Sequence, residues 1–247
     1  MASVAGTLER LAQNFTARDS MTPQDELRRA PDSAAALRML DEFPQFDVIP
    51  IEENGQLTAY LDRSTSRVAP IGLRDVVSDA TSILDLVDVL RDHRYTFVLQ
   101  ARQPVGYIHF SDLNNPIVKL PFFVLFEALE RHAVELVGAF VNEDNLDKVL
   151  DPQRVSEITR KMDRLRENRA DLQWVNLLYF KEILDFTRYL EKLEIAGGDL
   201  DKLAKVRNLV SHAVSAPLVG NHHDVDRLSV AKRLSLSLMQ EAMNSTA

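Results

Sequence analysis

The run Asp47-Val-Ile-Pro-Ile-Glu-Glu-Asn-Gly-Gln-Leu-Thr-Ala-Tyr-Leu61 contains two apolar stretches on either side of a turn signal. Asn54-Gly55 favours a tight hairpin, because both residues tolerate the positive φ angles that such a turn requires. We therefore expect residues 47–51 and 56–61 to form paired strands. A segment of helical composition, Ser33–Leu40, precedes them.

The same order of elements recurs farther along the chain. A helical segment at Ser82–Leu90 is followed by a strand at Tyr95–Leu99, a turn at Ala101–Pro104 and a strand at Val105–Phe110. The copies are offset by 50 residues at the helix and by 47 at the strands. A period of this length predicts a repeated structural unit.

Three motifs accompany the repeat: Met21-Thr-Pro23, Ala59-Tyr-Leu-Asp-Arg-Ser-Thr65 and Gly106-Tyr-Ile-His-Phe-Ser-Asp112. With these motifs the first half resembles a tandem pair of cystathionine-β-synthase-type repeats, the CBS domain pair. The resemblance implies an α+β module over residues 13–117, divided into repeats at 13–67 and 68–117.

In that family a cleft between the repeats binds adenosyl ligands such as AMP, ADP, ATP or related dinucleotides. By resemblance, the ligand-binding candidates are His109, Ser111 and Asp112 in the second repeat and Asp62, Arg63 and Thr65 in the first. His109 and Asp62 stand where the family has Thr or Ser, and Thr65 stands where it has an acid, so one of the two sites is expected to be altered or lost. Two alternatives remain open: the repeats only dimerise, and Arg63 is a solvated surface residue.

The second half has long helical patterns and few strand signals. We expect a four- or five-helix bundle over residues 118–247, with a separate N-terminal helix over residues 1–12. The expected bundle helices are Phe122–Val141, Asp151–Ala170, Asp171–Leu193, Asp199–Val214 and Asp224–Met243. The fold class is thus tandem α+β repeats followed by an all-α bundle.

The most chemically suggestive motif is Arg207-Asn208-x-x-x-His212. At about 100° per residue, these three side chains share one helix face, opposite an apolar face. The motif and its place in the penultimate helix are similar to the signature of the HEPN superfamily, which includes many metal-independent endoribonucleases. The resemblance also implies that Glu127 or Glu130 of the first bundle helix supports the site.

RNA cleavage without a metal requires proton transfer and a cation beside the phosphate. His212 supplies the proton transfer, since both states of imidazole exist near neutral pH. Arg207 holds the phosphate and Asn208 orients the phosphate or the imidazole, giving a 2′,3′-cyclic phosphate product. One histidine cannot readily serve as both base and acid, so a two-fold homodimer or a higher oligomer is required.

Composition limits the other possibilities. Zero cysteines remove disulfide and thiolate chemistry, and the pattern of Met1–Phe15 is that of a short amphipathic helix, so we expect a cytoplasmic protein. A net charge of −8 argues against non-specific coating of nucleic acid, and neither DNA nor a membrane is an expected partner. His222-His223 with Asp224 and Asp226 lacks the spacing of a metal site, so no catalytic metal is expected.

These features together predict a dimeric endoribonuclease that an adenine nucleotide regulates. The short linker Asn114–Leu120 suggests that movement of the repeats tilts the helix after it. The basic run Arg160–Arg169 either guides RNA or forms an ordinary ion-paired helix face. The alternative overall function is a non-catalytic nucleotide-sensing adaptor or dimerisation module.

Overall fold

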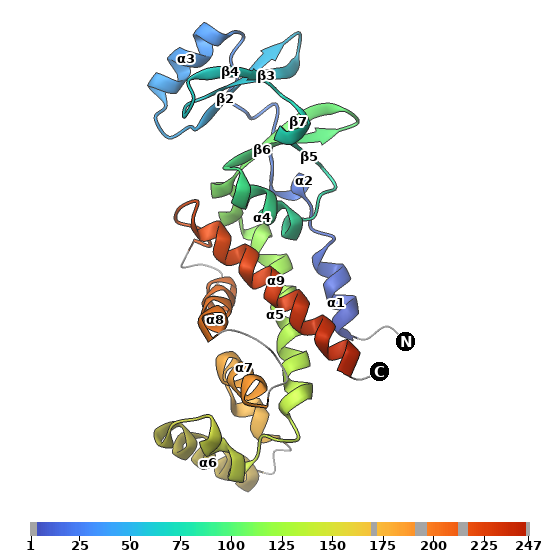
Figure 1. Ribbon diagram of the computed structural model, residues 1–247, viewed down its shortest axis with the longest axis vertical. Coiled ribbons are helices and arrows are strands. Elements are labelled where there is room, and N and C mark those ends of the chain that lie inside the picture. Colours follow the sequence, from blue (N-terminus) through green and yellow to red (C-terminus); the bar gives the residue numbers. More distant parts are fainter. Residues whose placement is uncertain (1–3, 169–171, 191–196, 212–216, 246–247) are drawn as a thin grey trace. The chain divides into compact units, whose positions relative to one another are not determined.

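The computed structural model describes residues 4–168, 172–190, 197–211 and 217–245. They form two compact units of a mixed α+β chain, and Figure 1 labels its α-helices and most of its strands. The N-terminal unit comprises Gln13–Val118 and Val219–Asp226, and the helical unit comprises the remaining described residues. The boundary at Val118 is one residue beyond the expected one, and helix α1 (Val4–Ala12) belongs to the helical unit.

The segment Val219–Asp226 was expected in the bundle but groups with the N-terminal unit. Long-range hydrogen bonds explain this correction. The Asn114 side chain donates to the Val219 carbonyl at 2.8 Å and accepts from the Val219 N–H at 3.0 Å. The His222 Nε2 atom lies 2.7 Å from the Leu90 carbonyl oxygen.

The N-terminal unit contains two small sheets, of strand order β2-β3-β4 and β1-β7-β6-β5. Its elements are α2 (Ala17–Ser20), β1 (Thr22–Pro23), α3 (Ser33–Glu42), β2 (Val48–Glu53), β3 (Gln56–Asp62), β4 (Arg67–Pro70), η1 (Leu73–Asp75), β5 (Val76–Ser78), α4 (Ile83–Asp92), β6 (Tyr95–Gln100), β7 (Gln103–His109) and η2 (Phe110–Asn114). The expected helix and two strands of each repeat are all present. Strands β1, β4 and β5 were not expected, because each is too short to give a periodic pattern.

The backbone repeats with an offset of 47 residues through both sheets. Each hairpin has its bulge at the same place, after Ile51 and after Val98. Both turns use two residues of positive φ, at Asn54-Gly55 and at Ala101-Arg102. The strand pairings outside the hairpins have the same offset. The antiparallel pair Thr22–Tyr107 corresponds to Ala69–Tyr60, and the parallel pair Ala30–Ile51 corresponds to Val77–Val98. Outside the helices α3 and α4, residues 47 apart therefore occupy equivalent positions in the two repeats.

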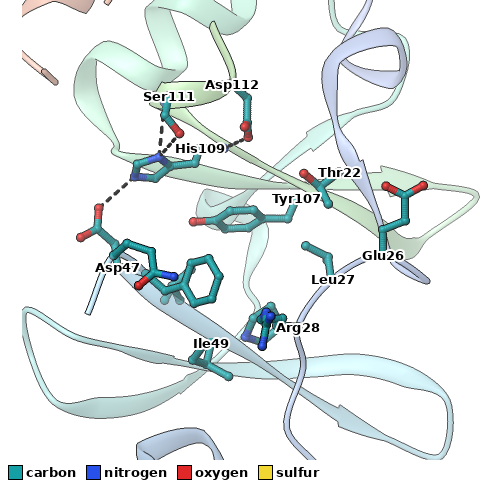
Figure 2. A pocket seen from close by; sticks show the side chains of 14 residues that line it. Thr22, Glu26, Leu27, Arg28, Asp47, Ile49, Tyr107, His109, Ser111 and Asp112 are labelled. Carbon is teal, nitrogen blue, oxygen red and sulfur yellow. Dashed lines mark hydrogen bonds and ion pairs between the residues drawn. The ribbon is translucent and has the colours of Figure 1, made fainter. Parts of the chain in front are cut away.

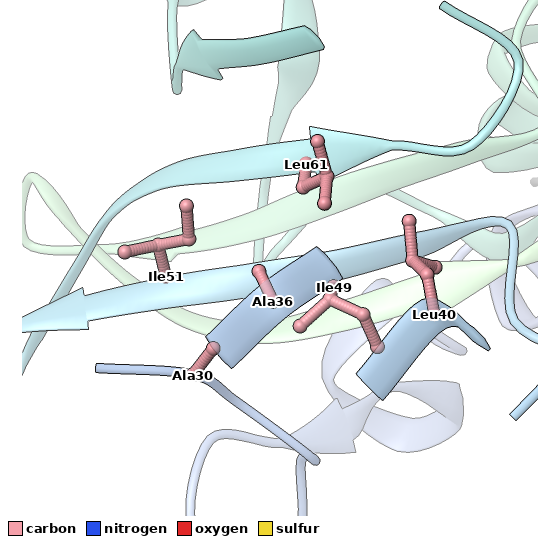
Figure 3. Packing of buried hydrophobic residues seen from close by; sticks show 6 residues of the cluster. All are labelled: Ala30, Ala36, Leu40, Ile49, Ile51 and Leu61. Atoms are coloured by element: carbon pink, nitrogen blue, oxygen red, sulfur yellow. The ribbon is translucent and has the colours of Figure 1, made fainter. Parts of the chain in front are cut away.

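Helix α3 packs its apolar face on the first sheet, as Figure 3 shows. The helix begins at a side-chain cap, since Asp32 accepts from the Ala35 N–H at 2.7 Å. In the second repeat Ser82 caps α4 in the same way. The buried cluster consists of Ala30, Ala36, Leu40, Ile49, Ile51 and Leu61.

The helical unit is built around α5 (Pro116–Val137), in which Phe122, Leu125 and Leu129 are buried. The helix begins six residues before the expected start, because burial of these side chains outweighs the backbone hydrogen bond lost at Pro121. The other elements are η3 (Glu143–Lys148), α6 (Pro152–Glu167), η4 (Trp174–Leu177), α7 (Phe180–Tyr189), α8 (Gly197–Ser211) and α9 (Asp224–Ser245). No helix in the described part of the chain is long and apolar enough to cross a membrane.

The helix expected from Asp171 to Leu193 is divided into η4 and α7 within the described residues. Tyr179 is extended, and its N–H donates to Glu182 Oε2 at 2.7 Å. This side-chain cap starts a new helix at Phe180. The apolar residues keep their helical spacing across the break, so the sequence pattern does not reveal it.

Candidate functional site

A cavity of about 530 Å³ lies within the N-terminal unit. Its walls come from residues 22–28, 45–50 and 107–112, so both repeats contribute (Figure 2). The candidates His109, Ser111 and Asp112 line it, whereas Asp62, Arg63 and Thr65 are not among its lining residues. The volume falls in the range of roughly 300–1,000 Å³ that is common for small-molecule sites.

A chain of hydrogen bonds fixes His109 at one wall of the cavity. His109 Nδ1 lies 2.8 Å from Ser111 Oγ, and Nε2 lies 2.9 Å from Asp47 Oδ2 (Figure 2). Arg94 Nε contacts the same Asp47 oxygen at 3.1 Å. The negative charge of Asp47 is therefore already compensated by Arg94 of the second repeat.

Asp112 is the third residue of the η2 turn and lines the same wall of the cavity. Its Oδ2 accepts from the His109 N–H at 2.7 Å. Burial raises the pKa of Asp112, and the hydrogen bond from His109 opposes that rise. A carboxyl group held in this way can accept hydrogen bonds from a ligand's hydroxyl groups.

Tyr107 lies between this wall and the opposite one in Figure 2. Burial raises the pKa of Tyr107 well above its usual value, and the nearby charges of Asp112 and Asp47 act in the same direction. Its hydroxyl therefore remains protonated and available as a donor. Sequence comparison of the repeats did not select Tyr107, Asp47 or Arg28, because their importance depends on contacts between segments distant in sequence.

The first-repeat candidates have structural roles. Arg63 donates from Nε to the Phe46 carbonyl at 2.7 Å and from Nη2 to the Leu40 and Phe43 carbonyls. Its guanidinium therefore binds carbonyls at and beyond the end of α3. Arg63 was expected to contact a phosphate or to be solvated, and neither alternative includes these hydrogen bonds to backbone carbonyls.

Asp62 and Thr65 form a turn in the first repeat. Asp62 Oδ1 accepts from the Thr65 N–H at 3.0 Å, and Oδ2 accepts from the Tyr95 hydroxyl at 2.8 Å. Burial alone raises the pKa of Asp62, but hydrogen bonds from Ser64, Tyr95 and Thr65 outweigh it and lower the pKa. The carboxylate is therefore used within the fold.

The position equivalent to the open cavity is filled by aromatic side chains. Where the first repeat has Val48 and Pro50, the second has Tyr95 and Phe97. These rings pack with Tyr60 and Tyr107 at centroid distances between 5.5 and 5.8 Å, and with each other at 6.3 Å.

We expect Tyr95→Phe to lower the free energy of unfolding by about 1.5 kcal/mol at pH 7, the magnitude of a hydrogen bond to a charged group. The pKa of Asp62 is lower in the folded chain, so its contribution is present above about pH 4 and is lost as pH falls below that value. Urea unfolding followed by circular dichroism should therefore show a smaller difference at pH 3 than at pH 7. Tyr189→Phe, at an exposed tyrosine, is the control. An equal loss at both pH values would contradict this account of Asp62.

In the helical unit, the structure places Arg207 on α8 against α5 and α7. Arg207 Nη2 lies 3.0 Å from Glu130 Oε2, and the guanidinium carbon lies 5.5 Å from the centre of the Phe180 ring. Asn208 is exposed beside it, and His212 lies outside the described residues. Glu130 is thus the one of the two candidate carboxylates that contacts Arg207, whereas Glu127 is exposed.

Phe180 is the residue at this site that the sequence did not single out. Its place at the start of α7, after the Tyr179 cap, puts its ring beneath Arg207. The Phe180 side chain is buried, so it also belongs to the core of the helical unit. Only the crossing of α7 and α8 gives it this second contact.

No cluster of three potential metal ligands occurs among the described residues. A comparison of the chain with models of protein families, with curated proteins and with solved structures found no match.

Proposed function

We propose that the protein is a homodimeric, metal-independent endoribonuclease whose activity is regulated by an adenine nucleotide bound in the N-terminal unit. The observation that carries the proposal is the cavity of about 530 Å³ bounded by His109, Ser111 and Asp112. The Asp112 carboxyl accepts from the ribose hydroxyls, and the Tyr107 hydroxyl donates to the ligand. Apolar side chains at Leu27 and Ile49 face the base.

The exposure of Asn208 and the anchoring of Arg207 favour the RNA part of the proposal. Arg207 is held by Glu130 and Phe180 yet keeps 31% of its side chain exposed, so a phosphate oxygen can reach it. A planar guanidinium binds a phosphate with two parallel hydrogen bonds. His212, four residues after Asn208 in the sequence, transfers the proton.

The dimer is supported by one face of α5. Leu120 and Phe123 are 45% and 46% exposed, and Glu127 and Glu130 follow them at helical spacing. Burial of the two apolar side chains against a second copy removes them from water. The same contact brings the Arg207 sites of two chains together, which supplies the second histidine.

Control by the ligand passes through α5 in this proposal. The chain enters α5 at Pro116, only a few residues after the η2 turn that carries Ser111 and Asp112. Nucleotide binding regulates cleavage if it favours one of two arrangements of that junction, because coupling requires different affinities for two states.

The test is cleavage of an end-labelled RNA in EDTA, with and without AMP, ADP and ATP. His212→Ala is expected to abolish cleavage and leave nucleotide binding intact. Asp112→Asn is expected to keep basal cleavage and to weaken nucleotide binding by about tenfold or more, the value of a hydrogen bond to a charged group. His223→Ala, at an exposed histidine, is the matched control and should behave as wild type.

Two results would separate the alternatives. If the folded dimer binds a nucleotide but cleaves no RNA under any condition, the enzyme proposal fails and the sensing adaptor remains. If RNA is cleaved but no adenine nucleotide binds, the regulatory part fails and the nuclease remains.

A further inference from the structure

The two repeats carry opposite charges at one equivalent position. Arg28 in the first repeat and Asp75 in the second are 47 residues apart. The strand pairings before and after each of them have this same offset, so the two residues are equivalent. Arg28 lines the open cavity. Asp75 instead lies in the filled region, where its Oδ1 accepts from the Tyr60 hydroxyl at 3.3 Å.

Arg28 is held in place without an ion-pair partner among the described residues. Its guanidinium carbon lies 4.1 Å from the centre of the Phe43 ring, which positions the charge by a cation–π contact. The side chain is exposed at the cavity, and Figure 2 shows it across the cavity from Asp112 and Ser111. It can therefore donate to a ligand group that lies away from the Asp112 wall.

The charges of the lining residues limit how many anionic groups the cavity accepts. Arg28 is the one lysine or arginine among the described residues that line it. The carboxylates there are Glu26, Asp47 and Asp112, of which Asp47 is paired with Arg94 and hydrogen-bonded to His109. The single guanidinium of Arg28 is thus accompanied by two further carboxylates, Glu26 and Asp112. Each phosphate of the ligand after the first adds negative charge to the cavity, and no further cation among the described lining residues is there to bind it.

We propose that the cavity selects a nucleoside 5′-monophosphate, one per chain, and that Arg28 is the residue that binds its phosphate. This inference rests on the proposed function and narrows its ligand. The phosphate lies on Arg28 and the ribose hydroxyls lie toward Asp112, on opposite sides of the cavity. The equivalent position in the second repeat takes no second molecule, because Tyr95 and Phe97 fill it and Asp75 would repel a phosphate.

Isothermal titration calorimetry of the full chain in EDTA, with adenosine, AMP, ADP and ATP, tests the proposal. We expect AMP to bind at least about tenfold more tightly than adenosine, the value of a charge-assisted hydrogen bond, and more tightly than ADP or ATP. The stoichiometry should be one AMP per chain. Arg28→Gln should remove the advantage of AMP and leave the affinity for adenosine unchanged.

Arg38→Gln is the matched control, because Arg38 is exposed on α3 and does not line the cavity. It should leave all four affinities at their wild-type values. Equal binding of adenosine and AMP, tighter binding of ATP than of AMP, or two molecules per chain would each overturn this inference while leaving an adenine-ligand site in place. Absence of binding by all four compounds would overturn the regulatory part of the proposed function together with the inference.

Discussion

Replacement of Arg207 by alanine is expected to slow RNA cleavage by about a hundredfold to a thousandfold. Loss of one preorganised donor to a developing anion has an effect of this size in other enzymes. Arg207 is preorganised by the 3.0 Å contact with Glu130 and by the Phe180 ring. Its loss should scarcely alter stability, because an ion pair in which the two side chains are 31% and 29% exposed is screened by water. Single-turnover cleavage in EDTA measures the rate, and circular dichroism verifies the fold.

Two variants separate the role of Arg207 from general effects of charge. Lys205→Ala removes an exposed cation two residues earlier on α8 and should change the rate little. Glu130→Gln keeps an oxygen acceptor for Arg207 and should have a much smaller effect than Arg207→Ala. A variant lacking Arg207 that cleaves RNA at a rate close to wild type would rule this residue out of the chemistry.

Replacement of Arg154 by alanine is expected to lower the stability of the helical unit by about 3 kcal/mol, since it leaves a partly buried carboxylate without its partner. Arg154 donates to Glu182 from Nε at 2.6 Å and from Nη2 at 3.0 Å, and to the Leu177 carbonyl at 3.1 Å. The two side chains are only 12% and 15% exposed. Hydrogen bonds to Glu182 raise the pKa of Arg154, so its guanidinium stays charged. The single tryptophan, Trp174 in η4, reports urea unfolding of this region.

Arg164→Ala, at an exposed arginine on the same helix, is the control for loss of a cation. The double variant Arg154→Ala/Glu182→Gln should be less destabilised than the sum of the two single variants, because each single change breaks the same contact. Simple additivity would show that the ion pair does not join α6 to α7 energetically.

The sequence by itself determined the features that depend on neighbouring residues. Asn54-Gly55 fixed the first hairpin, and Asp32 and Ser82 fixed the starts of α3 and α4 through hydrogen bonds within one turn. The offset of the repeat followed from comparing the chain with itself, and the structure has the same offset in its bulges and strand pairings. The helical character of the second half was likewise readable from its apolar periodicity.

The break between η4 and α7 marks the limit of that periodicity. Buried residues continue at helical spacing through Leu177, Phe180 and Leu184, so the pattern gave no sign of the extended Tyr179. A cap can stop a helix without interrupting its hydrophobic face. The identity of the capping acid, Glu182, was visible in the sequence but was also compatible with a helix interior.

Only the tertiary structure decided which candidate residues face a cavity and which hold the fold together. Arg63 and Arg28 both belong to the first repeat, yet Arg63 binds three backbone carbonyls and Arg28 remains at a cavity wall. Likewise, Asp112 lines the open cavity while Asp62 accepts from Tyr95. The physical reason is that burial and hydrogen-bond partners come from segments far away in the chain, so the same residue type acquires a different role in each repeat.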